Sequence, residues 1–316
     1  MTATFVEHWA SAAERGLAHA AASDLTRSQT AAIAVLRALV ARNGIVRMGE
    51  DAAAACALVS DDMPWRALCL LLQGAASHLS GNRKDARPQL EEGARCAAVA
   101  APSIQVLCLA QLAVLAVEQE DWNAAEMLAS RARRQLERVG LTDYPVSALV
   151  LAVSALVRAQ RGRVDDAQQD AREGLRLLAE LADFTPWYEA EARLMLARAA
   201  LRLSDLAGAR TLLDEASRVA GRAPDAVLLG TWLAESWAQA DSFSAAAILG
   251  PSSLTTAELR VLRLLPTHLS FREIAGRMHV SANTIKTQAH AVYRKLDASS
   301  RTEAVSNARL VGLLEV

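Results

Sequence analysis

The sequence of 316 residues contains no apolar run close to the roughly 18 to 20 residues that a membrane-spanning helix requires. Its first residues, Met1 to His8, lack the basic segment and apolar stretch of a signal peptide. Hydrophobic residues make up 52% of the chain and charged residues 22%, which is typical of globular proteins rather than disordered ones. These features predict a cytoplasmic protein that does not contact a membrane.

Patterns for metal binding and catalysis are also missing. The six histidines are not spaced as ligands with each other or with the cysteines, which form no C-x-x-C pair. No G-x-x-x-x-G-K-[ST] loop is present to bind a nucleotide, and no Ser-His-Asp or Cys-His arrangement has a supporting motif. We therefore expect no metal, no cofactor and no enzymatic activity, and we expect the thiols to be reduced and buried. The cysteines are Cys56, Cys69, Cys96 and Cys108.

The alternation of polar and apolar residues that strands produce is absent from residues 1 to about 245. Apolar residues recur there at helical spacing, and small residues recur with a period near 40. Four alanines stand 39, 42 and 42 residues apart, with a small residue 12 positions before and 7 positions after each, and a proline 22 or 23 positions before. The residues are Pro64, Pro102, Pro145 and Pro186; Gly74, Ala113, Ala155 and Ala197; Ala86, Ala125, Ala167 and Ala209; and Gly93, Ala132, Gly174 and Ala216.

This pattern predicts helix hairpins. Proline suits the first turn of a helix, and small residues let two helices cross closely. The hairpins must stack, because a single one cannot bury its apolar face. The segment near residues 30 to 60 is interpreted as a degenerate first repeat, and 225–240 as a capping helix. The basic run at 131–134 is expected to coat a solvated helix face.

The small-residue pattern resembles tetratricopeptide repeats, and its long period is similar to that of the MalT-like variety. The resemblance covers roughly residues 30 to 220. It implies a solenoid that binds a peptide, a protein or a small-molecule effector on its concave face. A generic right-handed helical solenoid is the broader interpretation.

Ser, Gly and Pro become frequent near residues 242 to 253, which predicts a linker at 246–253 between a repeat domain at 1–245 and a second domain at 254–316. In the second domain, Ser or Thr is followed three residues later by Glu in three places, the pattern of a capping box. Ser281 supplies a further helix cap. Four short helices are therefore expected. The capping pairs are Thr255–Glu258, Ser270–Glu273 and Ser300–Glu303.

The third of these helices, expected at about 282 to 296, contains no carboxylate. Solvated helices normally carry both signs of charge, whereas amide, hydroxyl and basic groups match base edges and phosphates. From Leu254 onward, nine Lys and Arg stand against five Asp and Glu, while the preceding residues carry 25 against 30. A basic end on an acidic body indicates contact with DNA.

Five segments of the second domain resemble the LuxR/GerE-type DNA-binding domain in order and spacing. The resemblance implies a helix-turn-helix at about 270–289, with the helix at 282–296 in the major groove of double-stranded DNA, and binding of two half-sites as a homodimer. Members of the family often have arginine where this chain has Ala257, glycine where it has His268 and histidine where it has Gln288. We expect His290 to take the role of this last histidine on the reading helix. The matching segments are 254–262, 269–275, 280–286, 293–296 and 300–305.

The resemblance also places contacts on the reading helix and at its start. The expected base-edge residues are Lys286, Thr287 and His290, and the expected phosphate residues are Ser281, Asn283, Thr284, Arg294 and Lys295.

The sequence thus predicts an all-α protein, a tetratricopeptide-like helical solenoid followed by a four-helix LuxR-type helix-turn-helix domain. Its predicted function is sequence-specific transcription regulation, with the repeats sensing an effector or partner protein. The missing strands exclude the receiver and pheromone-binding domains of some LuxR-type regulators. The domain order resembles the last two thirds of ATP-binding regulators, so both a shortened relative and part of a longer product are open. The alternative function is an interaction scaffold with a weak or vestigial DNA-binding domain.

Overall fold

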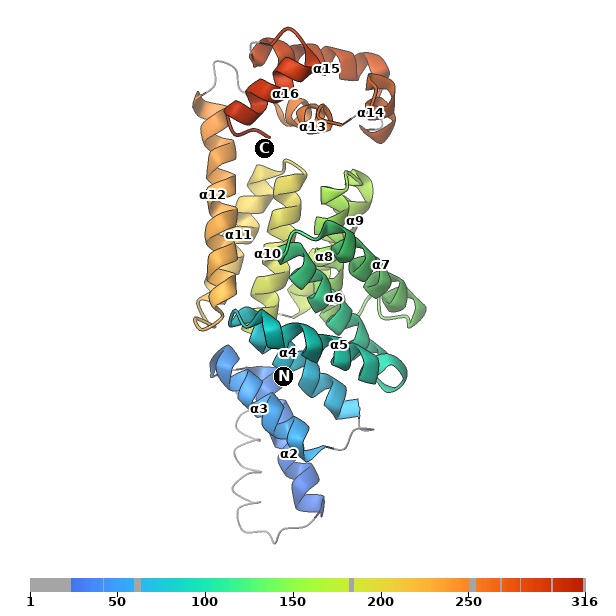
Figure 1. The fold of residues 1–316 in the computed structure, drawn as a ribbon, viewed down its shortest axis with the longest axis vertical. Coiled ribbons are helices and arrows are strands. Elements are labelled where there is room, and N and C mark those ends of the chain that lie inside the picture. Colours follow the sequence, from blue (N-terminus) through green and yellow to red (C-terminus); the bar gives the residue numbers. More distant parts are fainter. Residues whose placement is uncertain are drawn as a thin grey trace.

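The computed structural model describes residues 24–41, 43–59, 64–181, 185–249, 254–267, 269–278, 280–296 and 298–314. The secondary structure of these residues is helical, as the sequence predicts. None of their helices is both long enough and apolar enough to cross a bilayer. The helices from α2 to α11 stack along the long axis of the molecule, and the helices from α13 to α16 lie at one end (Figure 1).

Consecutive helix hairpins form the stack, and the first helix of each predicted hairpin begins at or just after its proline. In the third predicted hairpin the proline opens a short 3-10 turn that leads into the α-helix. The hairpins are α2 (Asp24–Val40) with α3 (Gly44–Leu58); α4 (Pro64–Leu79) with α5 (Arg83–Ala100); α6 (Pro102–Glu118) with α7 (Trp122–Arg138); η1 (Pro145–Ser147) and α8 (Ala148–Gln160) with α9 (Val164–Glu180); and α10 (Pro186–Arg202) with α11 (Leu206–Ala220).

Small residues lie where the helices cross, as the repeat pattern predicts. Ala125, Ala167 and Ala209 have no exposed surface. A Cβ atom added to Gly74 would lie 2.5 Å from Cγ of Leu90 on the neighbouring helix. Larger side chains at these positions would force the helices apart, because the interior of a protein is close-packed.

The turn inside each of the hairpins from α4 to α11 has the same backbone geometry. One residue of the turn adopts a left-handed conformation, and the next amide donates to a carbonyl of the last helical turn. An example is the amide of Asn82, which donates to the carbonyl of Ser77 at 2.7 Å. This Schellman arrangement satisfies carbonyls that the helix end leaves unpaired. The left-handed residues are Gly81, Glu120, Gly162 and Ser204, with φ of 88°, 57°, 73° and 62°.

A long helix, α12 (Val227–Leu249), runs along the stack beside α10 and α11 and reaches α4 near its start (Figure 1). Just before it, Asp225 accepts a hydrogen bond from the amide of Val46 at 2.9 Å. The ring of Trp232 packs edge-on against His78, with centroids 5.4 Å apart. Helix α12 therefore connects the first hairpins with the C-terminal end. It extends into the expected linker, whose residues 250–253 lie outside the described residues.

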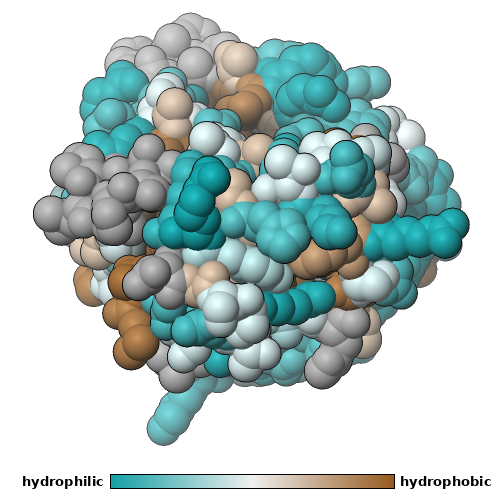
Figure 2. Space-filling model, turned by 90° about the horizontal axis from the view of Figure 1, so that it is seen from above, coloured by the Kyte–Doolittle hydropathy of each residue, from teal (hydrophilic) through white to brown (hydrophobic). Residues whose placement is uncertain are grey.

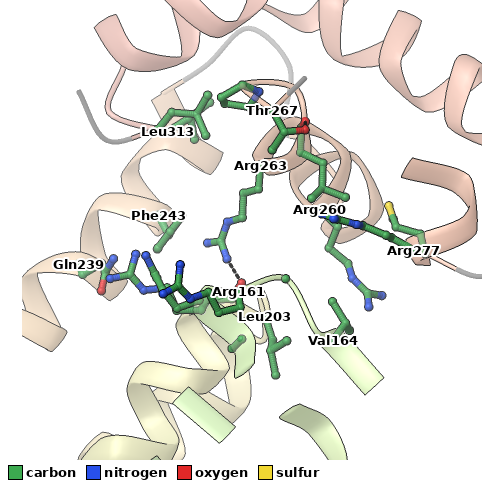
Figure 3. A pocket seen from close by; sticks show the side chains of 18 of the residues that line it. Arg161, Val164, Leu203, Gln239, Phe243, Arg260, Arg263, Thr267, Arg277 and Leu313 are labelled. Carbon is green, nitrogen blue, oxygen red and sulfur yellow. Dashed lines mark hydrogen bonds between the residues drawn. The ribbon is translucent and has the colours of Figure 1, made fainter. Parts of the chain in front are cut away.

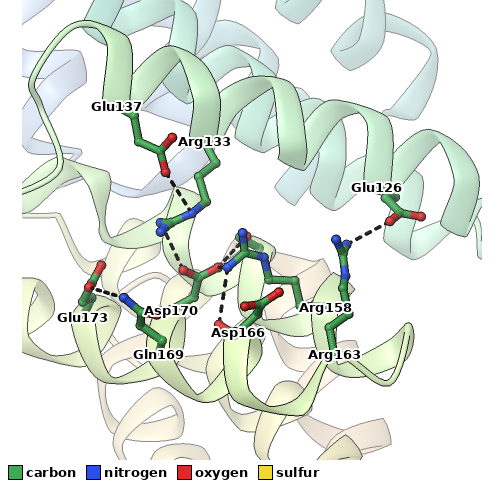
Figure 4. Close-up of polar contacts among 10 residues, drawn as sticks. Glu126, Arg133, Glu137, Arg158, Arg163, Asp166, Gln169, Asp170 and Glu173 are labelled. Carbon is green, nitrogen blue, oxygen red and sulfur yellow. Dashed lines mark hydrogen bonds and ion pairs between the residues drawn. The ribbon is translucent and has the colours of Figure 1, made fainter. Parts of the chain in front are cut away.

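Within the basic run, Arg133 is not solvated as expected. Its side chain is 14% exposed, and its Nη1 lies 3.0 Å from Oδ1 of the fully buried Asp170. The other oxygen, Oδ2, pairs with Arg158 at 2.9 Å and accepts from the Ser154 hydroxyl at 2.6 Å (Figure 4). Burial raises the pKa of Asp170, and these contacts only partly offset that effect. The prediction of a solvated face was wrong for Arg133 because its partner comes from the next hairpin.

The thiols differ in burial. Cys69 and Cys108 are buried, as predicted, and burial raises the pKa of both, that of Cys69 to about 12. Cys56 and Cys96 are only partly buried, contrary to the prediction. Each has a polar neighbour, because the Arg66 side chain donates to Cys56 and the Cys96 thiol donates to a carboxylate on its own helix.

Candidate nucleic-acid interface

Residues 254–314, apart from 268, 279 and 297, form short helices around a core of their own. The repeats contribute no residue to this core, and the buried side chains come from all of the short helices. The helices are α13 (Thr256–Leu264), α14 (Phe271–Met278), α15 (Ala282–Lys295) and α16 (Arg301–Leu310). The core residues are Val261, Leu262, Leu265, Ile274, Ala275, Ile285, Ala289, Val292 and Ala308.

Reciprocal capping boxes start α13 and α14, as the sequence predicts. The amide of Glu258 donates to the Thr255 hydroxyl, and the amide of Thr255 donates to the Glu258 carboxylate at 2.6 Å. Ser270 and Glu273 repeat the pattern, with the amide of Ser270 2.8 Å from the carboxylate. The Ser270 hydroxyl and amide hold the pKa of Glu273 below its ordinary value. These bonds fix where each helix begins.

Single side-chain caps start α15 and α16. The Ser281 hydroxyl accepts from the amide of Thr284 at 3.0 Å, so α15 begins where predicted. The Ser300 hydroxyl accepts from the amide of Glu303 at 3.2 Å. The Glu303 carboxylate, however, accepts from the amide and hydroxyl of Ser299, one residue earlier than in a simple capping box.

An ion pair joins the end of α15 to the start of α13. Nζ of Lys295 lies 2.7 Å from Oε2 of Glu258, and both side chains are largely buried. Burial alone would raise the pKa of Glu258, but the bonds from Lys295 and Thr255 outweigh burial and lower it. Lys295, expected from the sequence at a phosphate, therefore has its ammonium group in a structural ion pair. Residues 37 positions apart form this pair, so no local pattern indicates it.

Arg301 connects α16 to the turn between α13 and α14. Its guanidinium donates to the carbonyls of Leu265 at 2.8 Å, Leu269 at 2.7 Å and Thr267 at 2.7 Å. A weaker bond reaches Leu264. Sequence reasoning did not single out Arg301, although it lies within the segment 300–305 that resembles the family. Spacing alone does not show which carbonyls a side chain reaches.

The outer face of α15 brings together most of the residues expected to contact DNA. Asn283, Lys286, Thr287, His290 and Arg294 are all exposed, at the spacing of three and four residues that defines one helix face. The Thr287 hydroxyl donates to the carbonyl of Asn283 at 3.0 Å and keeps its lone pairs available. The His290 ring is exposed and packs edge-on against Tyr293.

Gln288, where the family often has histidine, is half-buried between this face and the core. Its Oε1 is buried and has no hydrogen-bond partner among the described residues. A side chain in this position reaches bases less readily than the exposed His290. Seen from above, this end of the molecule is mostly hydrophilic, with scattered apolar groups (Figure 2).

Two comparisons with known proteins found similarities, and the first of them lies at this end of the chain. Residues 252–308 match the family described as bacterial regulatory proteins, luxR family, also called GerE. The chain is 38% identical over 65 residues to "Transcriptional regulatory protein YdfI" of Bacillus subtilis (strain 168). That similarity covers 21% of this chain and 30% of the length of the Bacillus protein. The family match begins after α12, so it does not include the helical repeats.

Proposed function

We propose that this chain, whose C-terminal domain is a LuxR-family helix-turn-helix domain, is a sequence-specific DNA-binding transcription regulator of the cytoplasm. The observation that carries this proposal is the exposed face of α15, which combines Lys286, His290 and Arg294 with polar neutral residues and has no carboxylate. Helix α15 lies in the major groove, where such groups hydrogen-bond to base edges.

Lys286, Thr287 and His290 lie near the middle of the exposed face and are proposed to contact base edges. The Lys286 ammonium suits the two acceptors of a guanine, and the Thr287 hydroxyl, which donates to Asn283, can accept from a base. At the start of α15, a phosphate would meet unpaired backbone amides and the positive end of the helix dipole. Phosphate contacts are therefore proposed for Ser281, Asn283 and Thr284 at this end and for Arg294 at the other.

The remaining parts of the proposal concern assembly and control. Leu310, with 82% of its surface exposed, and Val311 form an apolar edge at the end of α16, which supports a homodimer on two DNA half-sites. The repeats are proposed to sense an effector or partner protein, since stacked helix hairpins present long binding surfaces. The tetratricopeptide-like character of these repeats belongs to the proposal too.

Enrichment of genomic DNA fragments by the purified full-length protein tests this function. Lys286→Ala removes one exposed lysine from α15. Lys84→Ala is the matched control, because Lys84 is an exposed lysine on α5, far from the DNA-binding face. We expect wild type and Lys84→Ala to enrich the same discrete promoter fragments and Lys286→Ala to lose that enrichment.

Two outcomes would contradict the proposal. Equal enrichment by wild type and Lys286→Ala would mean that α15 does not read the sequence. No enrichment of any fragment, by the full chain or by residues 250–316, would favour the interaction scaffold. Enrichment by the fragment alone would support DNA binding and show that the repeats hold it back.

A further inference from the structure

A cleft of about 650 Å³ lies between the repeats and the C-terminal domain. Its floor is formed by the turn after α8, the end of α10 and the side of α12. Its roof is formed by α13, the end of α14 and the residues after α16 (Figure 3). This volume lies within the range of about 300 to 1,000 Å³ that small-molecule sites occupy.

Arginines from both sides line this cleft, and none of the described lining residues is Asp or Glu. In Figure 3, Arg263 extends from α13 toward the repeats, and Arg161 lies on the opposite side. Charge of one sign along a concave surface raises the local concentration of counter-ions. The lining arginines are Arg161, Arg202, Arg260, Arg263, Arg277 and Arg309.

Some of these arginines already contact other groups. Arg161 pairs with Glu126 at 2.9 Å. Arg263 donates to the carbonyl of Arg202 and lies over the Phe243 ring, 5.1 Å from its centroid. Arg260 and Arg277 are different, because neither guanidinium makes a hydrogen bond or ion pair with the part of the chain that the structure describes, although the charge of Arg277 acts on Glu273 of its own helix. Both belong to the roof of the cleft.

Apolar side chains form much of the remaining wall. Leu203 and Phe243 come from the repeat side, and Met278 and Leu313 from the C-terminal domain. A purely inorganic anion would leave this apolar surface in contact with water, whereas an organic anion would cover it. Guanidinium groups favour phosphate and carboxylate because their planar donors match two oxygens at once.

We propose that this cleft binds a small organic anion, with its phosphate or carboxylate group at Arg260 and Arg277 and an apolar body against Phe243 and Leu313. Because both domains build the site, a bound anion stabilises their observed arrangement. No residue of α15 lines the cleft, so the DNA-binding face stays open when it is filled. The regulatory consequence of binding rests on the proposed function, whereas the site itself does not.

The probe for this site is 8-anilinonaphthalene-1-sulfonate, a fluorescent anion with an apolar aromatic body. We expect one saturable site in the full chain, and at least tenfold weaker binding by the double variant Arg260→Ala/Arg277→Ala. Arg272→Ala is the matched control, because Arg272 is an exposed arginine of α14 that does not line the cleft. Far-ultraviolet circular dichroism checks that each variant is folded.

Competition in the wild-type protein tests the ligand chemistry without any variant. Phenyl phosphate and benzoate distinguish a phosphate from a carboxylate, and benzyl alcohol is the neutral control. We expect one of the two anions to displace the probe and benzyl alcohol to leave it bound. Displacement by benzyl alcohol as strong as by the anions would overturn the proposal. Unchanged probe affinity in the folded double variant would also overturn it.

The DNA-binding proposal can fail independently of this site, because the titrations contain no DNA. Lys286→Ala is expected to bind the probe as wild type does, since Lys286 lies outside the cleft. Loss of DNA enrichment with normal probe binding would concern α15 alone. Normal DNA enrichment without a saturable probe site would leave the regulator in place and remove the anion site.

Discussion

Two fully buried carboxylates of the repeats differ from the carboxylates at the helix starts of the C-terminal domain. In the repeats, Asp170 and Glu191 are fully buried, and burial raises the pKa of each. In the C-terminal domain, hydrogen bonds at helix starts lower the pKa of Glu273 and Glu303, which are exposed. Glu258 is largely buried, but its bonds to Lys295 and Thr255 lower its pKa as well.

The difference follows from the size of the two regions. A continuous core extends through the stacked hairpins, whereas the C-terminal domain has a small core of its own. A small domain buries a smaller fraction of its surface and gains less from apolar contact. The repeats can therefore enclose a charged network without losing their fold. The C-terminal domain depends more on polar bonds that fix the helix starts and turns.

Removing the buried charge at Asp170 is expected to have the largest effect. Asp170→Ala removes the carboxylate and leaves Arg133, Arg158 and the Ser154 hydroxyl without its oxygens inside the stack, and losing one partner of a buried pair costs about 3 to 5 kcal/mol. Chemical denaturation measures the change in the free energy of unfolding. Asp143→Ala is the control, because Asp143 pairs with Arg176 on the surface and should contribute less than about 1 kcal/mol. Equal effects of the two variants would contradict the account.

Glu191 is expected to make the repeats less stable as pH rises. Burial raises its pKa to about 7, although His78 and the hydrogen bond from Gln111 lower it. The folded state therefore holds the proton more tightly than the unfolded state, whose pKa is near 4.5. Its contribution to stability is full below about pH 4.5 and is lost as pH rises through 7.

Glu191→Gln removes this titration and should stabilise the repeats by about 3 kcal/mol at pH 8, since each unit of pKa shift corresponds to about 1.4 kcal/mol. Thermal unfolding followed between pH 5 and 8 measures the difference. The variant and wild type should converge toward pH 5. A constant difference across this pH range would show that Glu191 does not titrate as described.

Arg301→Ala should destabilise the C-terminal domain by about 2 to 3 kcal/mol, because several partly buried carbonyls lose a charged donor. Hydrogen exchange followed by mass spectrometry should show faster exchange in α13 and α16 and no change in α4 to α11. Arg272→Ala, an exposed arginine of the same domain, should leave both regions unchanged. Faster exchange throughout the chain would mean that the two cores are not independent.

The smallest expected effect is a divergence of the two regions in mild acid. The lowered pKa values of Glu258, Glu273 and Glu303 mean that their stabilisation is present above about pH 4.5 and is lost as pH falls through their folded values. The C-terminal domain should therefore lose hydrogen-exchange protection before the repeats do as the pH falls below about 4.5. Earlier loss of protection in α6 to α11 would contradict this order.

Local patterns predicted the helices and where they begin. The spacing of Pro64 and Ala86 and its repeats predicted the hairpins, and the Ser or Thr caps predicted α13 to α16. Contacts between distant residues could not be predicted this way. Asp170 meets Arg133 of another hairpin, Arg301 reaches carbonyls of a turn more than 30 residues earlier, and the arginine-lined cleft joins two domains. Each depends on how finished elements pack, which periodicity does not specify.

The claim that the exposed face of α15 reads DNA is tested most directly by measuring equilibrium affinities across a salt series. The two DNAs are a fragment recovered in the enrichment experiment and a random sequence. We expect Lys286→Ala to cost about 1 to 3 kcal/mol on the recovered fragment and little on random DNA, because it removes a base contact. Arg294→Ala should weaken both and reduce the salt slope by about one, because it removes a phosphate contact. If Lys286→Ala and Lys84→Ala both kept wild-type discrimination between the two DNAs, α15 would not be the reading helix.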